Sequence, residues 1–284
     1  MRCFAFMLSL LLLPVLSWGQ DDREAVDNAL AARLQRDGVR HETRRALVWV
    51  EKDSLTDQEI TDFLRFIDPG IGAIEKYLGV TFASCGYKSD KVEYYISPTA
   101  GMSRASFEYK PQVFMSSRHV KAKSSGYLHE TAHVLSRWSK NALWIMEGLA
   151  THVDTIVKKQ LGDGSINIFN LEELPTHRKA AQIIQTPAGR DVLPLMGMDG
   201  SPITMTDAQK EIFRPLFDDR RAVTAPAFYN LSESFVTFVI EKLGMAKMRE
   251  IASAPSPRAA IRRLSGRTMD QWKADWLKML RKSA

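Results

Sequence analysis

Two histidines, His129 and His133, lie four residues apart in the segment YLHETAHVLSRW, and a glutamate, Glu130, directly follows the first of them. Residues four apart on an α-helix project from the same face, so both imidazoles can reach one metal ion. Zinc accepts such ring nitrogens at about 2 Å. Glu130 is placed to accept a proton from an attacking water and to pass it to a leaving amine. The pattern therefore predicts a zinc site with a hydrolytic role.

A catalytic zinc site also needs a third protein ligand and one open position. We expect the third ligand to be Glu147, in the segment NALWIMEGLATHVD. If one helix ends near Trp138 and the next begins near Asn141, the short connection makes the helices antiparallel neighbours. At 1.5 Å rise per residue, Glu147 then returns to about the level of His133. The neighbours of Glu147 are mostly apolar, where an unpaired carboxylate is costly; the alternative is a surface glutamate on an amphipathic helix.

These residues resemble the gluzincin zinc metallopeptidases, in particular the compact peptidase MA-like families. Those families carry HExxH and, at short spacing, a W-x-x-E-G-x-A segment. The second motif here consists of Trp144, Glu147, Gly148 and Ala150, and the match extends over about residues 124–157. Metzincins take a third histidine six residues after the second, a position that Ser139 occupies here. That class is therefore excluded.

The resemblance implies a small β-sheet whose edge strand flanks the substrate, followed by the active-site helix. The segment PQVFMSS, at residues 111–117, occupies the place of that edge strand. The resemblance also suggests that Tyr229 stabilises the oxyanion. The alternative is that Tyr229 is a plain core residue. Some relatives place an aspartate four residues after the ligand glutamate, where this chain has Thr151. Asp154 is a substitute that could orient a histidine.

Strand patterns come early in the chain and helical patterns later. Short β-rich runs occur at residues 45–53, 91–98 and 111–117, whereas residues 54–78 predict two helices separated at the DPG sequence. Further helices are expected at about 124–138 and 141–159, from Phe228 to Gly244, and near the C-terminus in MDQWKADWLKML. This order predicts an α+β fold. A small β-sheet lobe at residues 20–160 carries the HExxH helix, and a mainly helical lobe follows at residues 161–284.

The first 19 residues have the layout of a secretory signal peptide. One arginine precedes an apolar run of about 14 residues, and Ser17 and Gly19 stand before the polar sequence QDDRE. A membrane anchor, the alternative, needs about 20 apolar residues. We therefore expect cleavage near Gly19 and a secreted or periplasmic protein without stable membrane insertion. Cleavage removes Cys3 and leaves Cys85, which is expected to be a small buried residue and not a reactive thiol.

The sequence thus predicts a zinc-dependent peptidase that hydrolyses peptide bonds with a metal-activated water. Zn²⁺ is the expected cofactor and a peptide or protein the expected substrate. The alternative is a binding or scaffold protein of the cell envelope whose peptidase-like fold no longer cuts. A formal charge of +6, with lysines and arginines not gathered with aromatic residues, does not indicate a nucleic-acid partner. The other histidines, at positions 41, 119, 152 and 177, are expected to be surface or core residues.

Overall fold

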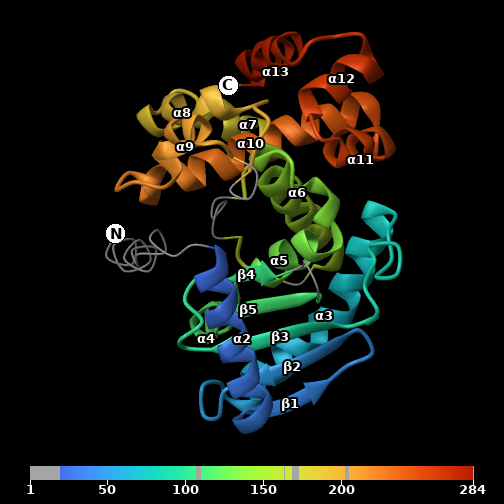
Figure 1. Ribbon diagram of the computed structural model, residues 1–284, viewed down its shortest axis with the longest axis vertical. Helices are drawn as coiled ribbons and strands as arrows, with labels where there is room; N and C mark the ends of the chain where they lie inside the picture. The colour runs from blue at the N-terminus through green and yellow to red at the C-terminus, as the bar shows by residue number, and fades with distance from the viewer. Residues whose placement is uncertain (1–19, 107–109, 163, 168–172, 202–204, 284) are drawn as a thin grey trace. The chain divides into compact units, whose positions relative to one another are not determined.

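The computed structural model describes residues 20–106, 110–162, 164–167, 173–201 and 205–283 (Figure 1). The expected signal peptide lies outside these residues. In the described part of the chain, no helix is long and apolar enough to cross a membrane. Contacts between residues divide the chain into two units. The first comprises Met1–Arg137 and Val153–Ile168, and the second comprises Trp138–His152 and Phe169–Ala284.

The first unit is built on a five-stranded sheet in the order β1-β2-β3-β5-β4. The strands are β1 (Val39–Glu42), β2 (Ala46–Val50), β3 (Val92–Ser97), β4 (Arg104–Ser106) and β5 (Gln112–Ser116). Strands β2, β3 and β5 are parallel, whereas β1 and β4 are antiparallel to their neighbours. The sheet is therefore mixed, with a short antiparallel strand at each edge. Together with the many helices, it makes the fold α+β.

The prediction that residues 111–117 form the edge strand is wrong. The segment is a strand, but β5 pairs with β3 on one side and with β4 on the other. All five residues of β5 are buried, as is usual for an interior strand. The edge position belongs to β4, whose three residues, Arg104–Ser106, are half-buried. A strand this short has too few residues for its alternation to stand out in the sequence.

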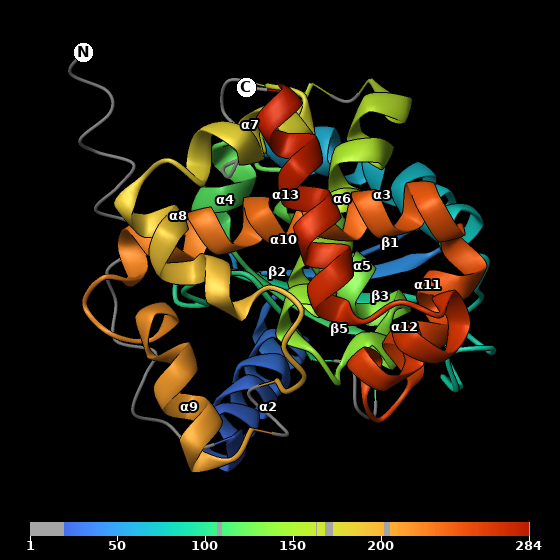
Figure 2. The same cartoon turned by 90° about the horizontal axis from the view of Figure 1, so that it is seen from above.

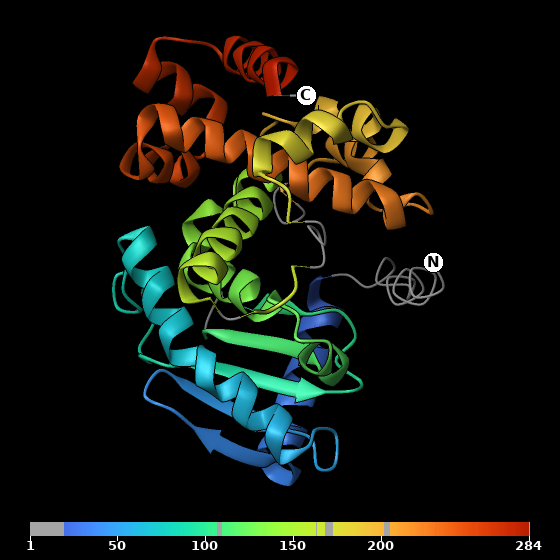
Figure 3. The ribbon, with the colours of Figure 1, turned by 180° about the vertical axis from the view of Figure 1, so that it is seen from behind.

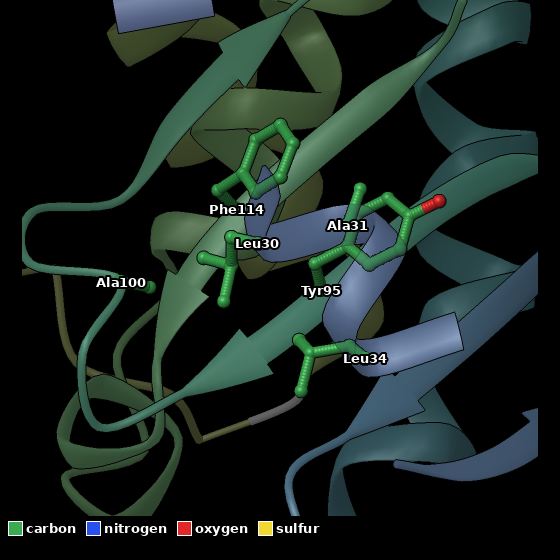
Figure 4. Close-up of a cluster of buried hydrophobic side chains, with 6 residues drawn as sticks. All are labelled: Leu30, Ala31, Leu34, Tyr95, Ala100 and Phe114. Carbon is green, nitrogen blue, oxygen red and sulfur yellow. The ribbon is translucent and has the colours of Figure 1, made fainter. Parts of the chain in front are cut away.

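Helix α2 (Gln20–Asp37) covers one face of the sheet. Its Leu30, Ala31 and Leu34 pack on Tyr95 of β3 and Phe114 of β5 (Figure 4). The two aromatic rings are register partners and stack with their centroids 5.2 Å apart. Because side chains alternate along a strand, the neighbouring residues of β3 and β5 face the opposite side.

That opposite face carries α3 (Asp57–Leu78) and α5 (Gly126–Leu135), while the short α4 (Ser117–Lys121) follows β5 directly. Figure 3 shows α3, in light blue, along this side of the sheet. Phe63 of α3 makes edge-to-face contacts with Tyr94 of β3 and Tyr127 of α5. Helix α5 therefore lies between the sheet and a second helix.

Residues 57–78 form one helix, so the expected break at the DPG sequence is wrong. Thr56 and Glu59 form a capping box at its start, and Gly79 ends it in the left-handed conformation. Pro69 lies inside the helix. A proline there costs about 3 kcal/mol or more. The apolar stripe on both sides of it, Ile67, Ile71, Ile74 and Leu78, is buried and offsets that cost.

The second unit is helical and centres on α10 (Arg221–Leu243), which contacts α7, α8, α11 and α13. The other helices are α6 (Leu143–Leu161, shared by both units), α7 (Thr176–Ile183), α8 (Pro187–Val192), α9 (Asp207–Phe213), α11 (Met245–Ser253), α12 (Pro257–Ser265) and α13 (Met269–Ser283). Figure 2 shows α13 crossing α10. Helices α7, α8 and α9 are short, with six to eight residues each.

Helix α10 begins at Arg221, seven residues before the predicted start at Phe228, and Pro226 lies within it. The first turns are held by side chains, since Thr224 Oγ1 lies within hydrogen-bond distance of the Pro215 and Arg220 carbonyls. Asn230 Nδ2 also donates to the carbonyl of Pro226 at 2.7 Å. These bonds stabilise backbone that proline leaves weaker. The predicted end at Gly244 is confirmed.

Candidate metal centre

The helix that carries His129 and His133 is buried along almost its whole length. Every residue of α5 from Tyr127 to Leu135 is buried. Thr131, on the face toward the sheet, donates its hydroxyl to the Tyr127 carbonyl at 2.6 Å and bonds the Tyr94 hydroxyl at 2.5 Å. Burial raises the pKa of Tyr94, so its hydroxyl keeps its proton. The middle of α5 is thereby bonded to β3.

The C-terminal end of α5 is held by side chains from the segment after α3. Tyr87 donates its hydroxyl to the Val134 carbonyl at 3.0 Å, and Cys85 donates its thiol to the Leu135 carbonyl at 3.3 Å. These are carbonyls that a helix end leaves without an intrahelical donor. Cys85 is buried, as expected from the sequence. Its thiol serves packing and capping.

The N-terminal end of α5 is tied to α6. Ser125 Oγ donates to Asp154 Oδ2 at 2.9 Å, and both residues are buried. A carboxylate at this position is favourable because the N-terminus of a helix carries partial positive charge. The sequence suggested that Asp154 orients a histidine. The bond to Ser125 fixes the start of the histidine-bearing helix, and the role of Asp154 toward a histidine stays a prediction.

His129 and His133 turn their Nε2 atoms toward each other at 3.1 Å. Their rings lie edge to face with centroids 4.7 Å apart, and 6% and 7% of the two residues is exposed. Glu147, on α6, completes the group: one ligand atom from each of the three residues lies within 4.8 Å of the others. The group is buried, although the Glu147 residue keeps part of its surface accessible.

This donor set fits a zinc ion. Two nitrogens held at 2.0–2.1 Å from one tetrahedral zinc are about 3.3 Å apart, close to the 3.1 Å between the two Nε2 atoms. Two imidazoles and one carboxylate are also a recurrent ligand set of catalytic zinc, which keeps its fourth position for water or substrate. Among the described residues, this is the group of three or more histidine, cysteine or acidic side chains that could hold a metal ion.

Glu147 stands on the part of α6 that packs against α10. A Cβ atom added at the next residue, Gly148, would lie 2.5 Å from the Ser232 carbonyl oxygen and 2.9 Å from Val236 Cγ2. Only glycine allows this approach of α10. The Trp144 ring lies 4.9 Å from that of Phe235. The turn that bears Glu147 is thus fixed by backbone and aromatic contacts.

Thr151, where some gluzincins have an aspartate, bonds within its own helix. Its hydroxyl donates to the Glu147 carbonyl at 2.8 Å, and the residue is fully buried. It therefore supports the backbone of the Glu147 turn.

The two predicted catalytic residues have different surroundings. Glu130 follows His129 on α5 and is 8% exposed, but it does not join the three-residue ligand group. Tyr229 lies on α10, half-buried, with its ring edge to face with that of Phe228. It precedes Ser232 by three residues on the helix. It therefore shares the side of α10 that approaches Gly148.

The remaining histidines lie outside the ligand group, and three of them have hydroxyl partners. His119 Nδ1 bonds Ser103 Oγ at 2.7 Å, and His177 Nδ1 bonds Ser234 Oγ at 2.9 Å. His152 Nδ1 bonds Thr237 Oγ1 at 2.8 Å, and burial lowers the pKa of His152 to about 4. His152 is therefore a neutral core residue. His41, on β1, is half-buried.

Sequence reasoning missed the supports of the site: Tyr94, Thr131, Ser125 and Ser232. Each acts through a partner that is distant in sequence or on another element. No spacing rule connects such pairs. The signal that the sequence offers is Gly148, whose lack of a side chain allows a close neighbour.

Comparison with known proteins adds little to this geometry. No family model matches the chain, and no curated protein matches it. A solved structure of a mutant M1 zinc metallopeptidase from Deinococcus radiodurans, bound to a Tyr-Ser-Ala substrate, is similar at 13% identity with a TM-score of 0.38. The similarity covers 84% of this chain and 50% of that one, so the chain spans about half its length. A likeness this low assigns no function, and the site rests on its own geometry.

Proposed function

We propose that the protein is a zinc-dependent peptidase of the gluzincin type. The observation that carries the proposal is the convergence of His129, His133 and Glu147, whose ligand atoms lie within 4.8 Å of one another. A bound zinc ion would supply Lewis acidity, which polarises a carbonyl and lowers the pKa of water. The compact HExxH and W-x-x-E-G-x-A motifs support a peptide or protein as the substrate.

The protein's own residues divide the remaining tasks. His129 and His133 would hold the ion through ring nitrogens, and Glu147 would hold it through a carboxylate oxygen. Glu130, beside His129 on the buried helix, takes the proton of the attacking water and later donates it to the leaving nitrogen. Glu130 is buried on this helix, 8% exposed. Tyr229 is the proposed donor to the oxyanion.

The experiment compares zinc content and cleavage of a mixed peptide library in wild type and in Glu130→Gln. Glutamine keeps the shape of the side chain but cannot take the proton. We expect about one zinc per chain in both proteins, with cleavage reduced about 10²- to 10⁴-fold in the variant. Undiminished cleavage by Glu130→Gln would remove this residue from the mechanism. Full zinc binding without any cleavage by wild type would favour the non-catalytic alternative.

A matched pair of histidine variants tests the ligand assignment. His133→Gln should lose zinc, since it removes one of three ligands. His119→Gln should retain zinc, because His119 bonds Ser103 and lies outside the ligand group. Equal zinc content in the two variants would contradict the assignment.

A further inference from the structure

The net positive charge of the protein is concentrated in its last 41 residues. Residues 244–284 contain ten lysines and arginines but three acidic residues, a formal charge of +7. The whole chain carries +6, so the preceding 243 residues together carry −1. Such asymmetry is typical of a segment that meets an anionic partner.

These residues fold into the last three helices, α11, α12 and α13, which follow one another in the second unit. Helix α11 contacts α12, and α12 contacts α13. Each helix buries an apolar side: Met248 and Ile251 on α11, Ile261 on α12, and Trp276 on α13. Eight of the ten basic residues are exposed, and Arg249 and Lys273 are half-buried.

Helix α12 shows this division clearly. Pro257, Ala260 and Ile261 are buried on one side, whereas Arg258, Arg262 and Arg263 are exposed. At 100° per residue, the three arginines all fall on the half of the helix away from the buried stripe. Arg267, in the turn after the helix, is exposed as well.

Helix α13 continues the pattern at its C-terminal end. Lys278, Arg281 and Lys282 are exposed and lie on the side opposite Trp272 and Trp276. Lys273 is the exception, because it points inward and donates to the Leu193 carbonyl at 2.7 Å.

Local carboxylates neutralise part of this charge. Each of the three acidic residues pairs with one arginine: Glu250 with Arg263 at 2.9 Å, Asp270 with Arg258 at 3.3 Å, and Asp275 with Arg267 at 2.6 Å. Within the described part of the chain, no carboxylate lies at ion-pair distance from the remaining exposed cations, which are Lys247, Arg262, Lys278, Arg281 and Lys282. This surface therefore keeps five cations for an external anion.

The surface is poor in the features that other anionic partners need. Residues 244–284 contain two aromatic residues, Trp272 and Trp276, and both are buried. Nucleic-acid bases thus find no stacking platform. The large apolar side chains exposed among the described residues (Val26, Val39, Ile166, Ile212 and Val223) all lie elsewhere. The described residues of this segment thus include no exposed large apolar side chain, and we expect charge to hold a partner at its surface.

We infer that the basic outer side of α11–α13 binds the headgroup surface of an anionic phospholipid bilayer. A flat array of phosphates complements cations spread over three helices better than a single small anion does. Each lysine or arginine near such a surface strengthens binding about fivefold at low salt. The attachment is peripheral and weakens as salt screens the charges.

The test is co-sedimentation of the full chain with vesicles of phosphatidylcholine alone or with phosphatidylglycerol added at about one third. Neutral vesicles measure any contribution of the apolar N-terminal residues. We expect binding to the anionic vesicles alone, lost between low and high salt. The variant Arg262→Glu/Lys278→Glu/Lys282→Glu should bind on the order of 100-fold more weakly. If the reversed charges perturb folding, glutamine at the same three positions removes the charges without reversing them.

The matched control is Lys52→Glu/Lys76→Glu/Lys88→Glu, which changes net charge equally at three exposed lysines of the first unit. It should keep near wild-type binding. An equal loss of vesicle binding in both triple variants would show that binding depends on net charge alone and would overturn the inference. Equal sedimentation with neutral and anionic vesicles would also overturn it, as would binding to a short DNA duplex without binding to anionic vesicles. None of these readouts depends on peptidase activity.

Discussion

Replacing Gly148 by alanine should loosen the turn that carries Glu147, although alanine is the better helix former. The added Cβ would lie 2.5 Å from the Ser232 carbonyl oxygen, 2.6 Å from its carbonyl carbon and 2.9 Å from Val236 Cγ2. Two of these atoms are backbone, so no side-chain rotation relieves the contact. Reaching an ordinary separation of 3.4 Å requires α6 and α10 to part locally by about 0.9 Å.

The cost of overpacking can be compared with the gain in helix propensity. Overpacking of this kind costs about 1–3 kcal/mol, whereas alanine gains about 1 kcal/mol over glycine in a helix interior. We therefore expect net destabilisation of up to about 2 kcal/mol, or a fall in Tm of several degrees, at about 2–4 °C per kcal/mol for a chain of this size. The displacement also exceeds the tolerance of about 0.5 Å for a preorganised site. Zinc affinity should fall about 10- to 100-fold.

Gly72→Ala is the matched control. Gly72 also lies within a helix, α3, but a Cβ there would meet Arg45 Cζ at 3.7 Å, an ordinary contact. This variant should raise stability by about 0.5–1 kcal/mol and leave zinc affinity unchanged. Thermal unfolding and competitive zinc titration measure both quantities. If Gly148→Ala behaves like Gly72→Ala in both assays, the α6–α10 contact does not position Glu147.

Two further predictions concern protons and metal. The pKa of His152 is lowered to about 4 by burial and by the nearby His177, so the unfolded chain binds more protons between about pH 6.5 and pH 4, and stability falls as pH falls through this window. The loss of folding free energy should approach about 3 kcal/mol. In His152→Gln the amide can still bond Thr237, so urea unfolding of this variant should depend less on pH. Identical pH dependence in variant and wild type would contradict this. Removal of zinc by a chelator should lower Tm. Zinc added back at 100 times its Kd should raise the free energy of unfolding by about 2.7 kcal/mol. A Tm that does not change with zinc would show that the ion does not bind the folded state.

The sequence predicted features that depend on local spacing. Helical register alone places His129 and His133 one turn apart, and the structure brings Glu147 to them; their roles as ligands stay predictions. The α+β composition followed from strands that precede helices. The helix end at Gly244 also followed from a residue type at a fixed place in the pattern. The lobe boundary near residue 160 stays a prediction.

The failures have a common physical origin in tertiary contacts. A helix break was expected at the DPG sequence, and a helix start at Phe228. Pro69 and Pro226 both lie inside helices, because buried apolar stripes or side-chain bonds stabilise the weakened turns. Gln112–Ser116 was placed at the sheet edge, but the short β4 pairs with it. The bond between Thr131 and Tyr94 joins residues 37 apart in the sequence, which no periodicity reveals.

The most direct test of the account is X-ray absorption spectroscopy at the zinc edge on the zinc-loaded protein. We expect a first shell of nitrogen and oxygen at about 2.0–2.1 Å, with two imidazole rings visible in the outer-shell scattering. His133→Gln should reduce these to one ring in any zinc that remains, and Glu147→Gln should lower zinc affinity with both rings retained. A spectrum without two imidazoles, or one that neither substitution changes, would contradict a metal centre formed by His129, His133 and Glu147.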